Sequence, residues 1–303
     1  MKTIDQLIRI QHKSLLSLMA VLAISCTSNV RAEITQCTEI TSIPTVITEQ
    51  GIYCLKNNLA SSETNIKAID IQTSNVTIDF NEFKLGGLAA GANTQSTGIY
   101  AMGRKNIILR NGNIRGFQTG LLLEAPSGDI SPGGGHVVEN NRFDSNKRVA
   151  VNVEGIGNVI RGNIINATGG STAELAFGML VTGPGMEVVN NKINGTHSEG
   201  SVSSASGIFM DDAEGAIVKY NHISNTISEG DSFGIIMDGG DQILLQGNVV
   251  INSDQQGSIG ISNEGAASAV CRDNTILNFS NGLIDCINSV GNVVLGENVP
   301  VSR

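Results

Sequence analysis

The chain has 303 residues, of which 36 are glycine, 16% are charged and 4% are aromatic. Its mean hydropathy is close to zero and its formal net charge is −9. Low charge at this hydropathy excludes a disordered chain, and the lack of a Gly-X-Y period excludes collagen. The acidic balance argues against a nucleic-acid partner, because phosphates require lysine and arginine. Length alone would allow about two domains.

The N-terminal segment, residues 1–32, has the pattern of a signal peptide. Lys2, Arg9 and Lys13 give a positive start, an apolar stretch begins at Leu15, and Ala32 closes a small-residue cleavage site. The stretch of about ten apolar residues is too short to cross a bilayer, and no later segment is long enough. We therefore expect a periplasmic or secreted protein without a transmembrane segment. A lipoprotein signal ending at Cys26 is the weaker alternative, because Ala23 replaces the usual leucine.

Four cysteines follow the predicted signal peptide: Cys37, Cys54, Cys271 and Cys286. An even number of cysteines in an exported protein indicates disulfides. Closeness in sequence favours Cys37–Cys54 and Cys271–Cys286, although three pairings are open.

Two short patterns alternate along the chain. The first is an apolar residue, two variable residues, Asn, one variable residue and another apolar residue, and it recurs about every 27 residues. Its Asn positions are Asn81, Asn141, Asn163, Asn191, Asn221, Asn248, Asn274 and Asn298, with Gly112 in one such place. The second pattern is Gly followed by three mostly apolar residues, as at Gly207 and Gly234.

Apolar runs of three to five residues bounded by Gly and Asn indicate short strands. A short unit of strands that repeats along a chain predicts a solenoid, in which successive coils stack in parallel about 4.8 Å apart. Asn tolerates left-handed backbone angles, so it suits the turns, and its amide can bond to the next coil.

These repeats resemble the right-handed parallel β-helix, the pectate-lyase-like superfold. The resemblance implies an all-β solenoid of about nine coils over residues 65–303. The segment from Cys37 to Leu59 is similar to the N-terminal cap of exported members, so residues 33–64 are expected to be a cap segment.

Aligning the Gly-containing strands predicts two outward columns, because side chains alternate along a strand. In this alignment Ile208 and Met210 face inward. The first column is Tyr100, Leu122, Val151, Leu180, Phe209, Ile236, Ser262 and Ile284. The second column is Met102, Glu124, Val153, Thr182, Asp211, Asp238, Glu264 and Cys286.

Three acids in consecutive coils, Asp211, Asp238 and Glu264, make the candidate site. Three interpretations stay open: solvated turn residues, a cation site, or a catalytic pair. Carboxylates held close together attract Ca²⁺, which is therefore a candidate cofactor bound by these three acids. Alternatively, Asp211 and Asp238 act on a glycosidic bond as acid and base or nucleophile. Phe209, Ile236, Asp212 and Glu264 are the predicted substrate-binding residues.

No specific enzyme family can be assigned from motifs. Asp211-Asp212 resembles the acidic pair of polygalacturonases, but the Asn-Thr-Asp, Gly-His-Gly and Arg-Ile-Lys motifs of those enzymes are missing. The prediction is an exported β-helix protein that binds or processes a polysaccharide, as a glycoside hydrolase or polysaccharide lyase if it is an enzyme. The alternative is a structural or adhesive surface protein that forms a homo-oligomer through its apolar column.

Overall fold

The computed structural model describes residues 36–126, 133–170, 175–200, 203–253, 257–266 and 268–296. The predicted signal peptide, residues 1–32, the alternative lipid site at Cys26 and the last repeat position, Asn298, lie outside these ranges. Within them the chain consists of short strands, with one 3₁₀ turn, η1, at Leu88–Ala90. None of the described helical structure is long and apolar enough to cross a membrane.

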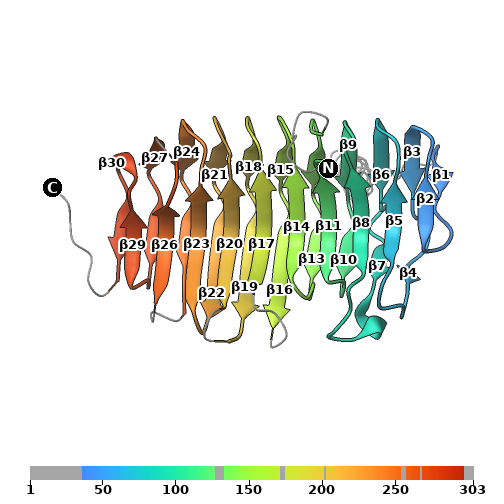
Figure 1. Ribbon diagram of the computed structural model, residues 1–303, viewed down its shortest axis with the longest axis horizontal. Coiled ribbons are helices and arrows are strands. Elements are labelled where there is room, and N and C mark those ends of the chain that lie inside the picture. Colours follow the sequence, from blue (N-terminus) through green and yellow to red (C-terminus); the bar gives the residue numbers. More distant parts are fainter. Residues whose placement is uncertain are drawn as a thin grey trace, which may run out of the picture. The chain divides into compact units, whose positions relative to one another are not determined.

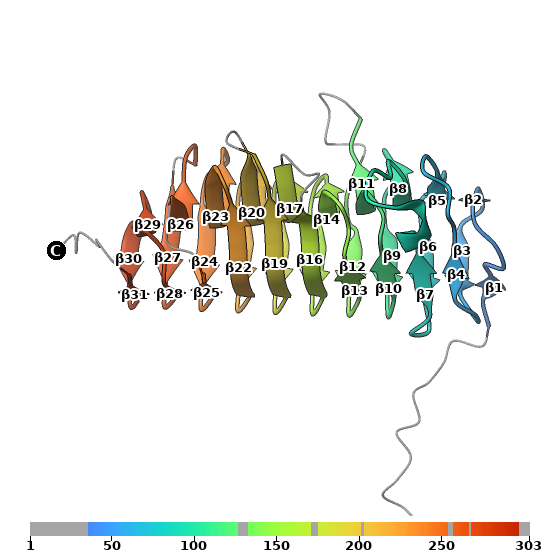
Figure 2. The ribbon, with the colours of Figure 1, turned by 90° about the horizontal axis from the view of Figure 1, so that it is seen from below.

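The strands form three parallel sheets, here called A, B and C, and each coil of the chain adds one strand to each sheet. Figure 1 shows the strands following one another in chain order along the long axis of residues 36–296, and Figure 2 shows the same order after a quarter turn.

Sheet A has eleven strands: β1 (Thr38–Glu39), β3 (Gly51–Cys54), β6 (Val76–Asp79), β9 (Ile107–Arg110), β12 (Val137–Glu139), β15 (Val159–Arg161), β18 (Glu187–Val189), β21 (Ile217–Lys219), β24 (Ile243–Gln246), β27 (Ala269–Arg272) and β30 (Ile287–Val290). Sheet B has ten strands: β2 (Thr45–Ile47), β5 (Lys67–Ile71), β8 (Thr97–Met102), β11 (Thr119–Glu124), β14 (Val149–Glu154), β17 (Leu175–Thr182), β20 (Ser204–Asp211), β23 (Asp231–Asp238), β26 (Ser258–Asn263) and β29 (Asn281–Ile284). Sheet C has ten strands: β4 (Leu59–Ala60), β7 (Lys84–Gly86), β10 (Asn113–Arg115), β13 (Arg142–Asp144), β16 (Ile164–Gly170), β19 (Lys192–Ser198), β22 (His222–Ser228), β25 (Val249–Ile251), β28 (Thr275–Leu277) and β31 (Val293–Leu295).

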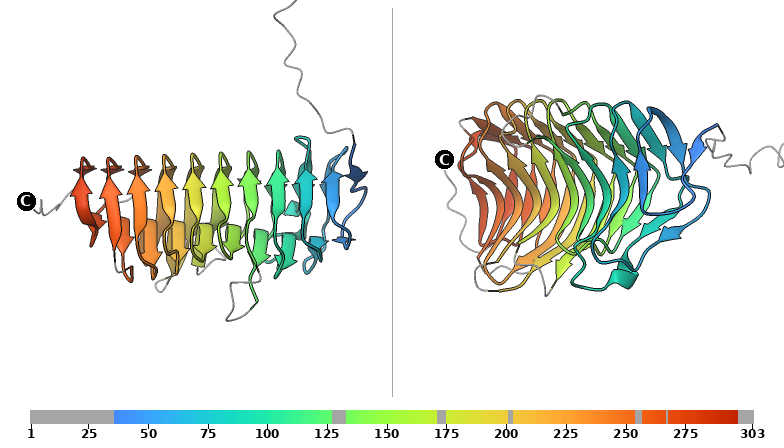
Figure 3. Two further views of the ribbon diagram at one scale, coloured as in Figure 1. Left: turned by 90° about the horizontal axis from the view of Figure 1, so that it is seen from above. Right: turned by 45° about the vertical axis from the view of Figure 1, so that its right-hand side comes forward.

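Complete coils of one strand from each sheet run from β3–β5 to β27–β29, which confirms the predicted parallel β-helix. Figure 3 shows the stacked coils obliquely, with the three sheets enclosing a common interior. The predicted cap segment supplies β1 to β4, and β2, β3 and β4 pair in parallel with the next strand of their sheets. These residues therefore continue the solenoid at its N-terminal end, and their role as a cap stays a prediction.

The core lies inside the coils and consists of stacked aliphatic side chains. Ile208, Ile235 and Ile261 are aligned on three neighbouring strands of sheet B, and each is fully buried. Gly207 precedes the first of them for a steric reason, because a Cβ there would collide with Cγ2 of Ile223. The Gly-apolar pattern thus marks a tight corner where two consecutive residues face the interior.

A ladder of asparagine side chains joins the coils at the turn between sheets A and C. We call it the Asn ladder; its members are Asn141, Asn163, Asn191, Asn221, Asn248, Asn274 and Asn292. From Asn163 to Asn274, each Nδ2 donates a hydrogen bond of 3.0 Å to Oδ1 of the next member. The repeat pattern did not predict Asn292, which follows Asn274 after a shorter interval than the other members.

From Asn163 to Asn292, each ladder amide donates two hydrogen bonds and accepts two. Asn191 donates from Nδ2 to the Ile160 carbonyl at 2.9 Å and to Asn221 Oδ1 at 3.0 Å. Its Oδ1 accepts from both the backbone N–H and the side chain of Asn163. Because Asn191 is 1% exposed, these bonds replace water that the amide cannot reach.

The left-handed turn residue is not the ladder asparagine in most coils, contrary to the sequence expectation. The residue just before it has positive φ, as in Asn140 (55°), Asn190 (57°) and Tyr220 (56°). The ladder asparagine is thus free to point its amide inward, while its neighbour turns the chain. Asn81, with φ of 47°, is the exception that matches the expectation.

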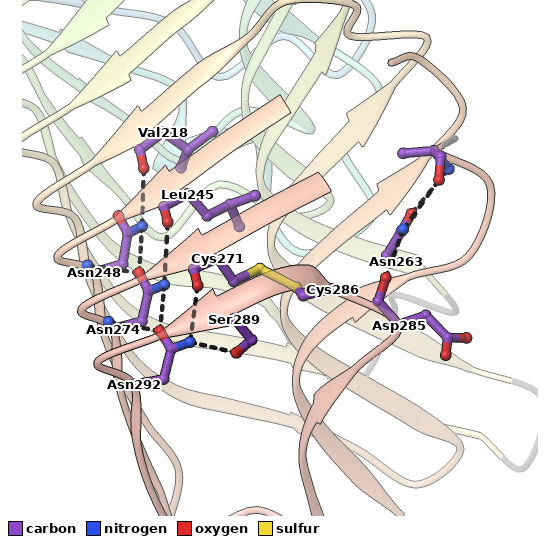
Figure 4. Close-up of a disulfide and its surroundings, with 11 residues drawn as sticks. Val218, Leu245, Asn248, Asn263, Cys271, Asn274, Asp285, Cys286, Ser289 and Asn292 are labelled. Atoms are coloured by element: carbon purple, nitrogen blue, oxygen red, sulfur yellow. Dashed lines mark hydrogen bonds between the residues drawn. A yellow bond between two sulfur atoms is a disulfide. The ribbon is translucent and has the colours of Figure 1, made fainter. Parts of the chain in front are cut away.

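The structure contains the two predicted disulfides, Cys37–Cys54 and Cys271–Cys286, each with a Cα–Cα distance of 5.8 Å. Figure 4 shows the second bond beside the end of the Asn ladder, where Asn292 donates to the Cys271 carbonyl at 2.9 Å. Disulfides therefore link neighbouring coils near both ends of the described solenoid.

Replacing Asn191 by alanine should destabilise the protein by about 3–5 kcal/mol, because the Asn163 amide and the Ile160 carbonyl lose buried partners. Thermal and urea unfolding of the mature protein measure the change.

The matched control is Asn190→Gly, at the exposed neighbouring position. Glycine accepts the left-handed backbone there, so the free energy of unfolding should change by about 0.5 kcal/mol or less. Equal losses for the two variants would contradict the structural role of the ladder.

Candidate functional site

The candidate site lies on the outer face of sheet B, whose strands β5 to β29 are labelled across the front of Figure 1. In β20, Ile208 and Met210 are fully buried, while Phe209 and Asp211 are half-buried on the opposite face. The predicted inward and outward directions are therefore confirmed. Parallel pairing repeats this alternation in the neighbouring coils, so outward side chains form columns.

An apolar column runs along this face. Leu180, Phe209 and Ile236 occupy equivalent places on neighbouring strands, as predicted, and Ser262 takes the next place. The rings of Phe209 and Phe177 meet edge to face, with centroids 5.4 Å apart. This edge-to-face contact holds two half-buried rings on the outer face and extends its apolar surface.

A column of carboxylates runs beside the apolar column. Thr182, Asp211 and Asp238 are aligned on β17, β20 and β23. The parallel strands bring Asp211 and Asp238 into neighbouring coils, about 4.8 Å apart along the stack. The acidic pair that the sequence predicts is therefore present as a spatial pair.

The predicted columns are wrong by one residue in β14. Leu122 pairs with Asn152 rather than with Val151, and Glu154 rather than Val153 pairs with Thr182. Val151 and Val153 are fully buried. The signal that identifies the correct register is Ala150, a small residue aligned with Gly120. The strands are close together here, because a Cβ added to Gly120 would lie 2.6 Å from the Ala150 carbonyl oxygen.

In this register Glu154 joins the carboxylate column, near Glu124 of β11. Glu154 accepts a hydrogen bond from the Ala125 N–H at 3.0 Å and one from Asn152 Nδ2 at 3.4 Å. Burial raises the pKa of Glu154 above its ordinary value, and the negative charge of Glu124 adds to the rise.

Asp211 has an electrostatic environment suited to proton exchange. Burial is the largest cause that raises the pKa of its carboxyl group, followed by repulsion from Asp212 and Asp238. Asp238 itself is exposed. Two neighbouring carboxyl groups in unlike surroundings are an arrangement that can divide the roles of acid and base.

Tyr100 connects the two columns near the N-terminal end of the face. Its hydroxyl donates to Glu124 Oε2 at 2.9 Å, and burial together with this bond raises the pKa of Tyr100 to about 12. The Lys67 ammonium lies 3.3 Å from the centre of the Tyr100 ring. These contacts join residues of different coils, so no local sequence pattern reveals them.

The remaining predicted site residues lie at the rim of the face. Asp212 is exposed just beyond β20 with φ of 46°, and its N–H donates to the Asp238 carbonyl at 2.9 Å. Glu264 is exposed just beyond β26 and borders an open pocket of about 590 Å³ with Asp285. Ile236 is only 4% exposed, so it underlies the face and offers a ligand little surface.

Within the described residues, no group of three His, Cys, Asp or Glu side chains is arranged to hold a metal ion. Binding of Ca²⁺ by Asp211, Asp238 and Glu264 stays a prediction.

Replacing Asp211 by asparagine should raise the melting temperature at pH 7. The pKa of Asp211 is higher in the folded protein than its ordinary value of 3.8. The ionised carboxylate that is present at pH 7 therefore lowers the stability of the folded state, and the neutral asparagine removes this cost. Below pH 3.8 the carboxyl group becomes protonated in both the folded and the unfolded state, and the gain should vanish. Thermal unfolding at pH 7 and pH 3 measures both effects.

Asp241→Asn is the matched control with the opposite sign. Hydrogen bonds from Ser268 and from the Gln242 N–H lower the pKa of Asp241, so its charge is favoured in the fold. This variant should melt at a lower temperature at pH 7. A loss of stability in Asp211→Asn would contradict the assigned environment of Asp211.

A solved structure with a TM-score above 0.5 shows the same fold at low sequence identity. The Dettilon tailspike protein superposes with a TM-score of 0.52 and 12% identity, over 86% of this chain and 60% of that one. The periplasmic alginate epimerase AlgG gives 0.48 and 10%, over 82% of this chain and 69% of that one. A mannuronan C-5 epimerase A-module from Azotobacter vinelandii gives 0.36 and 15%, over 82% of this chain and 81% of that one.

No curated protein sequence matches the chain. The family described as the right handed beta helix region matches residues 130–299, which is more than half of the sequence. This match agrees with the three parallel sheets and the one-strand-per-coil order. The chain therefore belongs to the right-handed β-helix family.

Proposed function

We propose that the protein is exported and binds a polysaccharide along the outer face of sheet B. The observation that carries the proposal is the apolar column of Leu180, Phe209 and Ile236 running parallel to the carboxylates Asp211 and Asp238. Sugar rings have apolar faces and hydroxyl-bearing edges, so two such columns fit a chain of sugars lying along the stack. The repetition of both columns in successive coils suits a polymer better than a single small molecule.

In this proposal each predicted residue has a separate task. Phe209 forms the platform for a sugar ring, and Ile236 supports it from below. Asp212 and Glu264 are exposed and can accept hydrogen bonds from hydroxyl groups. The two disulfides support export, because such bonds persist in oxidising compartments.

Asp211 and Asp238 are proposed as the pair that would cleave a glycosidic bond. Burial and the neighbouring charges of Asp212 and Asp238 raise the pKa of Asp211, which suits it to donate a proton to the leaving oxygen, and the exposed Asp238 is the proposed base or nucleophile. The backbones of adjacent strands lie about 4.8 Å apart, which sets the starting separation of the two side chains. This spacing is closer to the about 5–5.5 Å of retaining glycosidases than to the wider separation in inverting enzymes.

Replacing Phe209 by alanine should weaken binding of a matching polysaccharide about tenfold, because the aromatic platform is lost. The control is Leu244→Ala, a half-buried apolar residue on the outer face of sheet A, which should bind normally. Binding to soluble polysaccharides is measured by calorimetry, with Ca²⁺ and with a chelator, below the melting temperature of each variant.

Product analysis of the same mixtures tests catalysis. Asp211→Asn and Asp238→Asn should bind but release no fragments if the pair is catalytic. Absence of binding to every polymer would contradict the proposed function. In that case light scattering tests the adhesive alternative, which requires the purified protein to form oligomers.

A further inference from the structure

The turn between sheets A and C repeats one left-handed backbone position from coil to coil. It is the residue directly before each member of the Asn ladder, and its φ lies between 54° and 72°. The residues at this position are Asn140, Gly162, Asn190, Tyr220, Gly247, Asp273 and Gly291. All of them except Tyr220 are Asn, Asp or Gly, the residue types that adopt this backbone most easily.

Tyr220 is unusual in its backbone and in its exposure. A bulky residue in the left-handed region costs free energy, and such costs are concentrated at functional positions. Its side chain is 57% exposed, and it is the one aromatic residue among the exposed large apolar residues that the structure describes. The ring lies over the turn of the next coil, because a Cβ added to Gly247 would lie 2.6 Å from its Cε1 atom. Gly247 thus supports the ring on one side, and much of the rest is open to solvent.

Two lysines flank this ring. Lys219 directly precedes Tyr220 at the end of β21, and Lys192 is aligned with His222 in the neighbouring coil of sheet C. Lys192 is exposed and Lys219 is half-buried. In the part of the chain that the structure describes, neither lysine takes part in an ion pair.

The cations at the equivalent places of earlier coils already have partners. Arg161 lies two strands before Lys219 in sheet A, and it pairs with Glu139 at 2.7 Å. Arg142 lies two strands before Lys192 in sheet C, and it pairs with an acid of its own strand, β13. The positive charge around Tyr220 is therefore left for a ligand to meet.

The combination of an open ring and two ammonium groups defines the chemistry of that ligand. The exposed flank of an aromatic ring can contact the C–H side of a sugar, and lysine ammonium groups donate hydrogen bonds to a carboxylate. The formal net charge of the chain is −9, which opposes a long polyanion such as a nucleic acid. A single carboxylate beside a sugar ring fits this site better than a polymer charged at every unit.

We propose that Tyr220, Lys192 and Lys219 form a second glycan-binding site, which takes one sugar acid within a largely neutral glycan. The sugar ring lies against Tyr220, and its carboxylate contacts the two lysines. The site is on the turn between sheets A and C and not on the outer face of sheet B, so the inference goes beyond the proposed function and does not depend on it. Such a site would anchor the protein to a glycan while the face of sheet B stays open.

The test is an NMR titration of the mature protein with two xylose oligomers of equal length, one with a single glucuronate branch and one without. The branched oligomer should bind at least about tenfold more tightly, because only its carboxylate reaches the lysines. A single-stranded DNA oligomer should bind more weakly than the branched sugar.

Tyr220→Asn separates a binding role of the ring from a structural one. Binding of the branched oligomer should weaken about tenfold, since the ring is lost. The melting temperature should stay the same or rise, because asparagine occupies the same left-handed position in Asn140 and Asn190. Binding is measured below the melting temperature of each variant.

The double variant Lys192→Gln/Lys219→Gln should bind the branched and unbranched oligomers equally. The matched control is Lys84→Gln, in the same outward column of sheet C four coils before Lys192. This control should bind like the wild-type protein.

Several results would overturn the inference. They are a folded Tyr220→Asn variant with wild-type affinity, a lysine double variant that keeps the preference, and unbranched sugar or DNA that binds as tightly as the branched oligomer. Absence of binding to the branched oligomer would also overturn it. Loss of binding in Phe209→Ala but not in Tyr220→Asn would place the glycan on sheet B, which refutes the inference and supports the proposed function.

Discussion

The hydrogen-bonded Asn ladder is the contact on which the rest of the solenoid depends. Each ladder amide from Asn141 to Asn274 binds the coils on both sides, so these coils must reach the turn between sheets A and C at the same place. Loops elsewhere can then differ in length without shifting the strands. The fully buried isoleucines add most of the hydrophobic stabilisation, but they are less selective about register than a saturated amide.

The candidate site is a consequence of that constraint. Asp211 and Asp238 are far apart in sequence, yet they are aligned because their coils are in register. The same alignment places Phe209 beside Ile236 and creates the apolar column. Repulsion between aligned carboxylates lowers stability, which is a common property of residues retained for binding or catalysis.

Much of this arrangement is predictable from sequence because the repeat is strict. Gly207 and Gly234 mark equivalent corners, so the columns in β20 and β23 are correct. The prediction fails in β14, where Ala150 stands in the glycine place and the apparent pattern slips by one residue. The contact of Tyr100 with Glu124 depends on side-chain packing between coils, which periodicity does not encode.

The most direct test of the account is the pKa of Asp211, measured by carboxyl-carbon NMR in the wild-type protein and in Asp238→Asn. If register holds the two acids together, removing the Asp238 charge should lower the pKa of Asp211. Part of the elevation should remain, because burial is its larger cause. An unchanged pKa would show that the two carboxyl groups are not neighbours and would contradict the account.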